Sequence, residues 1–362
     1  MVAITGPFHC LSYILLVLPP ILLTGYLLVS FPHPPESLHI HPSLASLPSE
    51  SKSWSIYPED FYAGGGYVRF PYGRVRYWLF GPEDGQKIVL IHGLSIPAFV
   101  WRDVAPGLAE KGLRVLVYDL YGRGYSDAPQ TTYDTQLYIT QLALLMQHVK
   151  WDKAVVAGLS MGGAIAAAFT ANFPNLVEDR TIVISSAGLI QSSDLPRTAK
   201  VISLPVIQAI SSSALAQKLI QLRTNSPNDP SKPVNPLHEI VRLQSAHLPG
   251  YNAALSSSLR DGPIRGEERS FRSEVWRGRR LLIIHGTADN TVPYRYASKI
   301  QSLLPIPIPV PTSTEKQQQQ LKGCHSKIIT IDGGGHDLTH SHSKEVVEHI
   351  YKWVHGSSSS SS

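Results

Sequence analysis

The sequence predicts an α/β protein in which a mostly parallel sheet is covered by helices on both faces. Two observations predict this fold class. Short apolar segments alternate with segments of helical periodicity, and a serine stands between two glycines at one strand-to-helix junction. Such alternation is typical of buried parallel strands joined by crossover helices. It begins near residue 87, stops near residue 187 and resumes near residue 281, so we expect one sheet built from two parts of the chain.

The composition is that of a large globular protein. The 362 residues include 43% hydrophobic residues, which suffices for one large α/β domain with an insertion. The net charge is +5, but Lys and Arg are scattered and form no stripe interleaved with aromatic residues, so we expect no nucleic-acid partner. Only Cys10 and Cys324 are present, which excludes a disulfide framework. No histidine–carboxylate cluster has ligand spacing, so we expect no metal or cofactor.

Residues 1–31 are predicted to form a single-pass membrane anchor. Residues 11–31 contain no charge and are mostly apolar, and a helix of that length spans about 30 Å, the thickness of a bilayer core. Pro19 and Pro20 would kink this helix, which membrane segments tolerate. A cleaved signal peptide, giving a secreted protein, and a buried hairpin are the alternatives. The absence of Lys and Arg before Lys52 argues against a signal peptide and leaves the membrane orientation open.

The segment after the anchor, residues 32–63, is predicted to be an extended linker. It opens with a dense mixture of proline and histidine and shows little periodicity. After three glycines, short aromatic runs at residues 67–70 and 74–80 are joined at a Pro-Tyr-Gly turn. These runs predict an antiparallel hairpin that opens the sheet.

The remaining elements follow from the alternating pattern. The predicted strands are residues 87–92, 114–119, 153–158, 181–185, 281–285 and 327–331. The predicted helices are residues 98–111, 135–149, a segment after residue 160, 294–304 and 343–354. Short helices and loops at residues 188–275 predict a helical cap inserted into a core of residues 64–187 and 276–355. Residues 305–323 are predicted to be a low-complexity loop, and residues 356–362 a disordered serine tail.

The pentapeptide Gly158-Leu159-Ser160-Met161-Gly162 carries the main chemical signal. It lies between an apolar strand and a helix rich in small residues, so Ser160 is expected on a strained turn with its hydroxyl exposed. The two glycines remove side chains where the strand and the helix approach closely. The helix that follows directs free N–H groups and its positive dipole end at an anion that forms near the serine.

A serine nucleophile needs a base, a group that orients the base, and donors for the oxyanion. Asp289 and His336 each follow a predicted strand, and the carboxyl ends of parallel strands meet at one edge of a sheet. We therefore expect Asp289 to orient His336, the base. The backbone N–H groups of Leu94 and Met161 are the expected oxyanion donors. His92 is expected to hold the Leu94 loop by hydrogen bonds.

Other residues compete for these roles. Asp261 and Asp332 are alternatives for the acid, although Asp332 is expected to bind backbone at the end of its strand. The glycine-rich segment 119–126 lacks the Lys-Ser/Thr of a phosphate loop and is predicted to be a structural turn at the rim of the site. The competing histidines are His340, His342 and His349 near the last helix, which are expected at the surface, and His238 and His247 in the cap, which are expected at the surface with contact to the substrate as the alternative.

These motifs together resemble the α/β-hydrolase superfamily over residues 64–355. The resemblance rests on His92-Gly93, Asp119-x-x-Gly122-x-Gly124-x-Ser126, Gly158-x-Ser160-x-Gly162, Gly286-x-x-Asp289 and Gly335-His336. It implies the α/β-hydrolase fold with an eight-stranded sheet, a cap over the site and a triad of Ser160, Asp289 and His336. The hexapeptide Gly-Leu-Ser-Met-Gly-Gly behind a membrane anchor is similar to monoacylglycerol lipases and related membrane-bound esterases. The loop at residues 305–323 departs from the usual pattern.

We therefore expect a serine hydrolase that cleaves carboxylic esters, of the monoacylglycerol type, through an acyl-enzyme. Hydrolysis of a carbon–carbon or amide bond, or acyl transfer, with the same triad is the enzymatic alternative. An inactive binding protein that has kept the fold is the non-enzymatic one. Epoxide hydrolase and dehalogenase chemistry are disfavoured, because the resemblance implies an aspartate in place of Ser160 for those reactions. The lipid expectation rests on the predicted anchor, since apolar cap residues can equally line an acyl pocket or pack on the sheet.

Overall fold

The structure is a computed structural model that describes residues 7–30, 38–204, 218, 235–306 and 323–356. It divides into two units, Met1–Leu38 and His39–Ser362, which we describe separately. Most of the predicted loop at residues 305–323, the serine tail beyond residue 356 and two stretches of the predicted cap lie outside the described residues.

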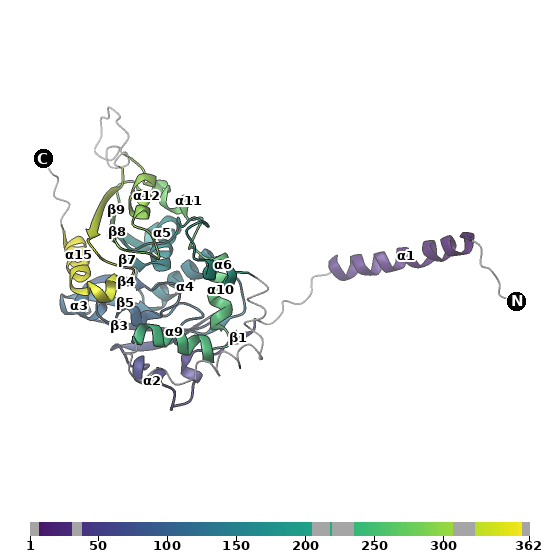
Figure 1. Ribbon diagram of the computed structural model, residues 1–362, viewed down its shortest axis with the longest axis horizontal. Helices are drawn as coiled ribbons and strands as arrows, with labels where there is room; N and C mark the ends of the chain where they lie inside the picture. Colours follow the sequence, from purple (N-terminus) through teal and green to yellow (C-terminus); the bar gives the residue numbers. More distant parts are fainter. Residues whose placement is uncertain (1–6, 31–37, 205–217, 219–234, 307–322, 357–362) are drawn as a thin grey trace. The chain divides into compact units, whose positions relative to one another are not determined.

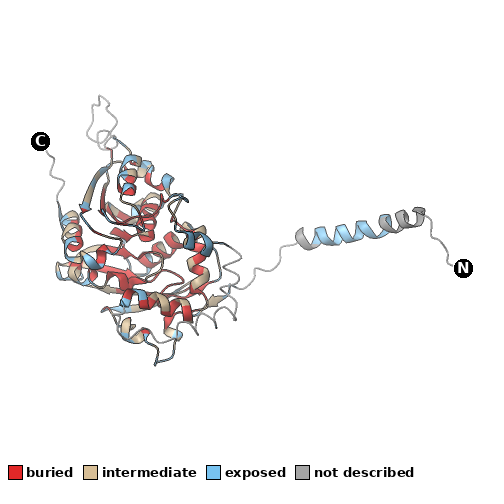
Figure 2. Cartoon of the chain, viewed as in Figure 1, coloured by how far each residue is buried: buried red, intermediate tan, exposed pale blue. Residues whose placement is uncertain are grey.

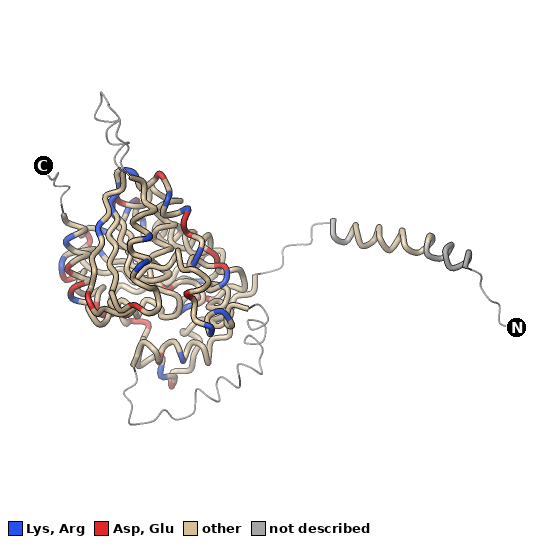
Figure 3. Tube along the Cα trace, turned by 45° about the horizontal axis from the view of Figure 1, so that its top comes forward, with Lys and Arg blue, Asp and Glu red and all other residues tan. Residues whose placement is uncertain are grey.

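The first unit contains one described helix, α1 (Pro7–Ser30), whose side chains are described for residues 15–27. These side chains carry no charge, and the described part of α1 is tan throughout in Figure 3. No helix in the described part of the chain is both long enough and apolar enough to cross a membrane. The predicted membrane anchor therefore stays a prediction.

The second unit is organised around one sheet. Among the described residues its strand order is β10-β9-β8-β7-β4-β5-β3-β2 (Figure 1). The strands are β2 (Gly65–Phe70), β3 (Gly73–Phe80), β4 (Gln86–Ile91), β5 (Leu113–Tyr118), β7 (Ala154–Leu159), β8 (Val177–Ile184), β9 (Arg280–Gly286) and β10 (His325–Ile331). Neighbours from β10 to β5 are parallel, whereas β3 pairs antiparallel with β5 and β2. The predicted fold class, a mostly parallel eight-stranded sheet, is confirmed.

Helices cover both faces of this sheet. One face is covered by α3 (Ala105–Glu110) and α15 (Ser343–His355), the other by α4 (Thr135–His148), α5 (Met161–Asn172) and α12 (Arg295–Leu303). Along β4, Ile88 and Leu90 belong to the core beneath α3 and α15, and Val89 and Ile91 to the core beneath α4 and α5. Successive side chains of a strand point to opposite faces, so a strand covered on both sides is apolar throughout. Figure 2 shows this buried interior in red.

The helix predicted at residues 98–111 is interrupted. The structure has a 3-10 turn, η2 (Ala98–Trp101), followed by α3, which begins at Ala105. Pro106 explains the break, because proline lacks an N–H and fits only the first turn of a helix. The short helices η3 (Pro174–Leu176) and α14 (Leu338–Ser341) precede β8 and α15 respectively.

Between β8 and β9 the described chain is helical, in the region of the predicted cap (residues 188–275). The elements are α6 (Arg197–Ile202), α9 (Pro236–His247), α10 (Tyr251–Arg260), α11 (Glu268–Phe271) and η4 (Glu274–Trp276). Asn235 caps α9 by accepting the N–H of Leu237, which fixes where that helix begins.

Residues 39–63 pack onto the sheet unit, where the sequence predicts an extended linker. Strand β1 (Ile40–His41) pairs antiparallel with β6 (Ala128–Pro129), and η1 (Leu44–Ser46) and α2 (Ser53–Ile56) follow. Tyr57 is fully buried, and its hydroxyl donates to the Asp119 carboxylate at 3.1 Å. Isolated large residues among prolines produce no periodic pattern, which is why the sequence does not reveal this packing.

Candidate active site

Ser160 lies on the sharp turn between β7 and α5, with φ 57° and ψ −119°. A positive φ strains a residue that carries a side chain, and such strain persists only where the surroundings impose it. The flanking glycines provide the surroundings. A Cβ on Gly158 would lie 2.0 Å from the carbonyl oxygen of Gly162, and a Cβ on Gly162 would lie 2.2 Å from that of Ile91. Strand β7, helix α5 and the end of β4 thus approach too closely for a side chain at either of these two positions.

Asp289 and His336 meet at the carboxyl ends of β9 and β10. His336 Nδ1 donates to Asp289 Oδ2 at 2.8 Å. The other carboxylate oxygen, Oδ1, accepts the backbone N–H groups of Thr291 at 2.9 Å and Val292 at 2.8 Å. The Asp289 side chain is buried, whereas the His336 side chain is 27% exposed. The two backbone N–H groups therefore fix the buried carboxylate, and the carboxylate in turn orients the partly exposed imidazole.

The charge of Asp289 follows from these contacts. Burial alone raises the pKa of this carboxyl group, but the hydrogen bonds from His336 and from the two backbone N–H groups outweigh burial, and its pKa is lowered. Asp289 is thus ionised at neutral pH. An ionised carboxylate beside Nδ1 keeps the ring proton on Nδ1, so that Nε2 of His336 has a free lone pair that can accept a proton.

Among the described residues, the Ser160 hydroxyl makes no hydrogen bond. The structure therefore joins His336 to Asp289 but does not join Ser160 to His336. A hydrogen bond between nucleophile and base commonly tightens only when substrate binds, so its absence does not remove His336 from the role.

The loop after β4, residues 92–95, runs against Ser160; we call it the oxyanion loop, after the role predicted for it. A Cβ on Gly93 would lie 3.3 Å from Ser160 Cβ and 3.8 Å from its Oγ. The N–H groups of Leu94 and Met161, the predicted oxyanion donors, have no acceptor within the described parts of the chain. Met161 directly follows the serine and Leu94 directly follows Gly93, so these two unpaired N–H groups remain candidates for the donors of an oxyanion site.

His92 holds this loop. Its Nε2 accepts the N–H of Leu120 at 2.9 Å, so the proton is on Nδ1, which donates to the carbonyl of Gly93 at 2.8 Å. Burial lowers the pKa of His92 to about 3, so the ring is neutral at physiological pH. The predicted role of His92, holding the loop rather than reacting, agrees with these contacts.

The segment 119–126 is a tight structural turn. The buried Asp119 accepts the N–H groups of Ala98 and Tyr125, each at 2.8 Å, and burial raises its pKa to about 7. Gly124 has φ 56°, and a Cβ there would lie 2.1 Å from an Asp119 oxygen, so only glycine fits.

The two competing aspartates and the histidines near the last helix have partners of their own. Asp332 accepts the Thr287 hydroxyl at 3.0 Å, and Asp261 accepts that of Ser257 at 2.9 Å. His340 contacts Asp103 at 2.7 Å on the exposed surface, and His349 lies 3.6 Å from Glu345. Within the described ranges, no hydrogen bond or ion pair links these residues to Ser160, Asp289 or His336.

Sequence reasoning missed a second histidine beside the acid. His285 is fully buried, its Nε2 donates to the carbonyl of Val292 at 2.8 Å, and the same atom lies 3.6 Å from Asp289 Oδ2. Burial lowers the pKa of His285, so it is neutral and acts as a hydrogen-bond donor. Its position one residue before Gly286, at the end of a strand, is the signal that could have revealed it.

Comparison with known proteins identifies the family. Residues 87–326 match the family model for the alpha/beta hydrolase fold. The chain belongs to this family. The chain is 36% identical to a soluble epoxide hydrolase from Corynebacterium sp. over 111 residues, which are 31% of this chain and 38% of that protein.

A second relative is a non-heme chloroperoxidase from Streptomyces lividans, 27% identical over 224 residues, which are 60% of this chain and 80% of that protein. Among solved structures, a carboxylesterase from Bacillus subtilis superposes with a TM-score of 0.60 at 16% identity, over 84% of this chain and 95% of that chain. That similarity shows the fold alone. The family and its hydrolase members support an enzyme, and the named activities of these relatives differ.

Proposed function

We propose that this alpha/beta hydrolase is a serine hydrolase that cleaves carboxylic esters through Ser160, His336 and Asp289. The observation that carries the proposal is the 2.8 Å hydrogen bond between His336 and Asp289, at the ends of strands in the same sheet whose β7 carries Ser160 on its strained turn. A serine that is only partly buried, an imidazole oriented by a carboxylate and two unpaired N–H groups are the groups that acyl transfer needs.

In the proposed reaction, Ser160 Oγ attacks the acyl carbon while His336 Nε2 takes the hydroxyl proton. The oxyanion accepts the N–H groups of Leu94 and Met161, and the ionised Asp289 stabilises the imidazolium. His336 then protonates the leaving alcohol, and the acyl group remains on Ser160. Water attacks this acyl-enzyme with the same base and releases the acid.

We further propose that the substrates are lipid-like esters of the monoacylglycerol type, met at a membrane through the N-terminal segment. Helix α1 supports this part, because its described side chains are uncharged and its large apolar residues are exposed, with Leu15 at 67% and Leu16 at 75%. A continuous exposed apolar surface favours association with lipid or with another apolar partner.

A fluorophosphonate probe tests the serine chemistry. We expect the wild type to be labelled at Ser160 and Ser160→Ala not to be labelled. His336→Gln should react about 10²–10⁴-fold more slowly, the usual contribution of a general base. His340→Gln is the matched control, because that ring lies on Asp103 at the surface, and it should react at the wild-type rate. Folded wild-type protein that is not labelled would contradict the proposal.

A series of p-nitrophenyl esters tests the lipid part separately. We expect kcat/KM to rise from acetate to octanoate, because a longer acyl chain buries more apolar surface. A clear preference for acetate over octanoate would reject lipid-like substrates while leaving ester hydrolysis intact.

A further inference from the structure

Arg123 is a fully buried cation beside the oxyanion loop. Its guanidinium donates to four oxygens: from Nε to Leu94 O at 2.8 Å, from Nη1 to Tyr121 O and to Tyr138 Oη, both at 3.1 Å, and from Nη2 to Ser258 Oγ at 2.8 Å. All four acceptors are uncharged, and among the described residues no carboxylate lies within ion-pair distance. A buried charge without a counter-ion is costly, so this arrangement calls for a functional reason.

Arg123 connects the oxyanion loop to the helices between β8 and β9. Leu94, whose carbonyl it binds, also carries one of the two unpaired N–H groups that are the predicted oxyanion donors. The next carbonyl, that of Ser95, accepts the Tyr251 hydroxyl at 2.9 Å and the Gln244 amide at 3.3 Å. The carbonyls of the loop are thus held by α9, α10 and Arg123, while the Leu94 N–H stays open.

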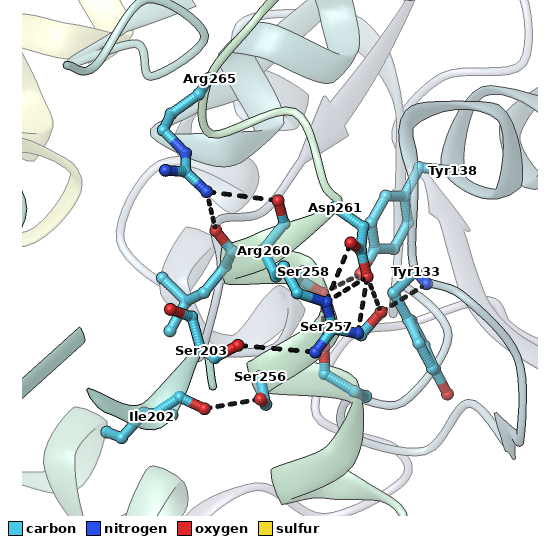
Figure 4. A network of polar contacts seen from close by, with 12 residues as sticks. Tyr133, Tyr138, Ile202, Ser203, Ser256, Ser257, Ser258, Arg260, Asp261 and Arg265 are labelled. Carbon is cyan, nitrogen blue, oxygen red and sulfur yellow. Dashed lines mark hydrogen bonds and ion pairs between the residues drawn. The ribbon is translucent and has the colours of Figure 1, made fainter. Parts of the chain in front are cut away.

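Helix α10 provides one of the four hydrogen-bond acceptors of the guanidinium, the hydroxyl of Ser258. The Ser258 hydroxyl donates to the carbonyl of Ala254 at 2.6 Å, so its oxygen accepts from both Arg123 and Tyr138, the latter at 2.7 Å. Figure 4 shows Ser258 facing Tyr138, with Ser256 and Ser257 beside it on α10. Every polar atom of this small network therefore has a defined partner, which fixes Arg123 in one position.

We propose that Arg123 is a positioning residue for the oxyanion site, with Ser258 of α10 holding it in place. The inference rests on the proposed ester hydrolysis. Arg123 fixes Leu94 through its carbonyl, so that the Leu94 N–H points to the oxyanion. Its charge also favours the developing negative charge, because a buried cation is weakly screened. The seating of α10 on the core thereby determines whether the oxyanion site is assembled.

The test compares two serines of one helix. Ser258→Ala removes an acceptor of Arg123. Ser256→Ala removes a buried hydroxyl that also binds a backbone carbonyl, that of Ile202 at 2.6 Å, but does not contact Arg123. We expect Ser258→Ala to lower kcat about 3- to 10-fold and Arg123→Gln to lower it about 10- to 100-fold, each with KM changed less than about twofold. Ser256→Ala should keep the wild-type kcat.

A boronic acid provides a readout that a merely structural role would not move. It adds to Ser160 Oγ and places a negatively charged oxygen at the oxyanion site, so its affinity should fall across the variants in parallel with kcat. Fluorophosphonate titration counts the intact sites, so that kcat refers to folded enzyme. Arg123→Lys, which keeps the charge but loses the forked hydrogen bonds, should fall between the wild type and Arg123→Gln.

The outcomes separate this inference from the proposed function. A wild type that reacts with neither fluorophosphonate nor a p-nitrophenyl ester overturns the proposed function, and this inference with it. With an active wild type, unchanged kcat and boronate affinity in Arg123→Gln and Ser258→Ala overturn the inference alone, as does an equal loss in Ser258→Ala and Ser256→Ala. If Arg123→Gln does not fold, the serine pair decides.

Discussion

At the scale of single residues, His92 illustrates how burial selects the charge state that the site needs. Its two ring nitrogens have opposite roles, one accepting from Leu120 and the other donating to Gly93, and a protonated ring would lose the acceptor. Burial excludes the charged form and lowers the pKa to about 3. The loop that carries the Leu94 N–H therefore depends on a histidine that stays neutral.

This dependence predicts how acid affects the protein. Between pH 6.5 and 3 an unfolded His92 binds a proton that the native ring does not, so the unfolding free energy falls as the pH falls through this window. The contribution is on the order of 5 kcal/mol, at about 1.4 kcal/mol per pKa unit. His92→Gln, which does not titrate, should show a flatter dependence in urea unfolding at pH 7, 5 and 4. An equal slope in both proteins would contradict this.

A second prediction at this scale concerns the acid. Asp289→Asn removes the negatively charged carboxylate that accepts from His336 Nδ1, and it should lower kcat by about 10²–10⁴-fold. Asp332→Asn is the control, because Asp332 contacts Thr287 instead, and it should hydrolyse a p-nitrophenyl ester at the wild-type rate. The opposite ranking would assign the acid to Asp332.

The sequence places Ser160, Asp289 and His336 because each follows a predicted strand, and the strands themselves can be recognised from their apolar pattern. It does not reveal His285 or Arg123. Their roles arise from burial and from contacts with residues far along the chain, such as Ser258, which is 135 positions from Arg123. No local pattern encodes such a contact.

At the scale of elements, the junction of β4, β7 and α5 sets the geometry of Ser160, the proposed nucleophile. Two backbones meet there at distances that exclude a Cβ, so the glycines are a packing requirement as well as a conformational one. Helix α3 shows the reverse situation. A Cβ on Gly107 would lie 3.3 Å from Cγ2 of Val347. A side chain at this position therefore meets only the end of another side chain and no backbone.

These two environments predict different costs for the same substitution. Gly162→Ala should destabilise the fold by about 1–3 kcal/mol or more and abolish fluorophosphonate labelling, because the backbone of β4 must move. Gly107→Ala should change stability by less than about 1 kcal/mol, since alanine favours a helix. Thermal unfolding of both variants checks this, and equal destabilisation would contradict it.

At the scale of the whole molecule, the chain divides at residue 38, and the sheet unit contains its own core. The fold class was predictable because apolar strands alternate with helices over most of this unit. The packing of residues 39–63 was not predictable, because Leu44 and Tyr57 are isolated buried residues within an aperiodic segment. Their partners lie in a different part of the sequence: Tyr57 donates to the buried carboxylate of Asp119, and the N–H of Leu44 donates to the carbonyl of Gly124.

This division predicts the result of a truncation. Removal of Met1–Leu38 leaves β1 and Tyr57 in place, so the remaining chain should fold with the melting temperature of the full chain and hydrolyse a soluble ester at the same rate. Flotation with phospholipid vesicles should recover the full chain and not the truncated one. Equal flotation of both would locate any membrane affinity in the sheet unit.

The order of the strands also has a consequence for synthesis of the protein. Ser160, the proposed nucleophile, is encoded in the first half of the chain, whereas the proposed acid and base follow β9 and β10, and among the described strands β10 pairs with β9 alone. Domains acquire structure while the ribosome is still extending the chain. A nascent chain therefore carries the serine long before it carries the imidazole, so under the proposed mechanism it cannot react until β10 has docked.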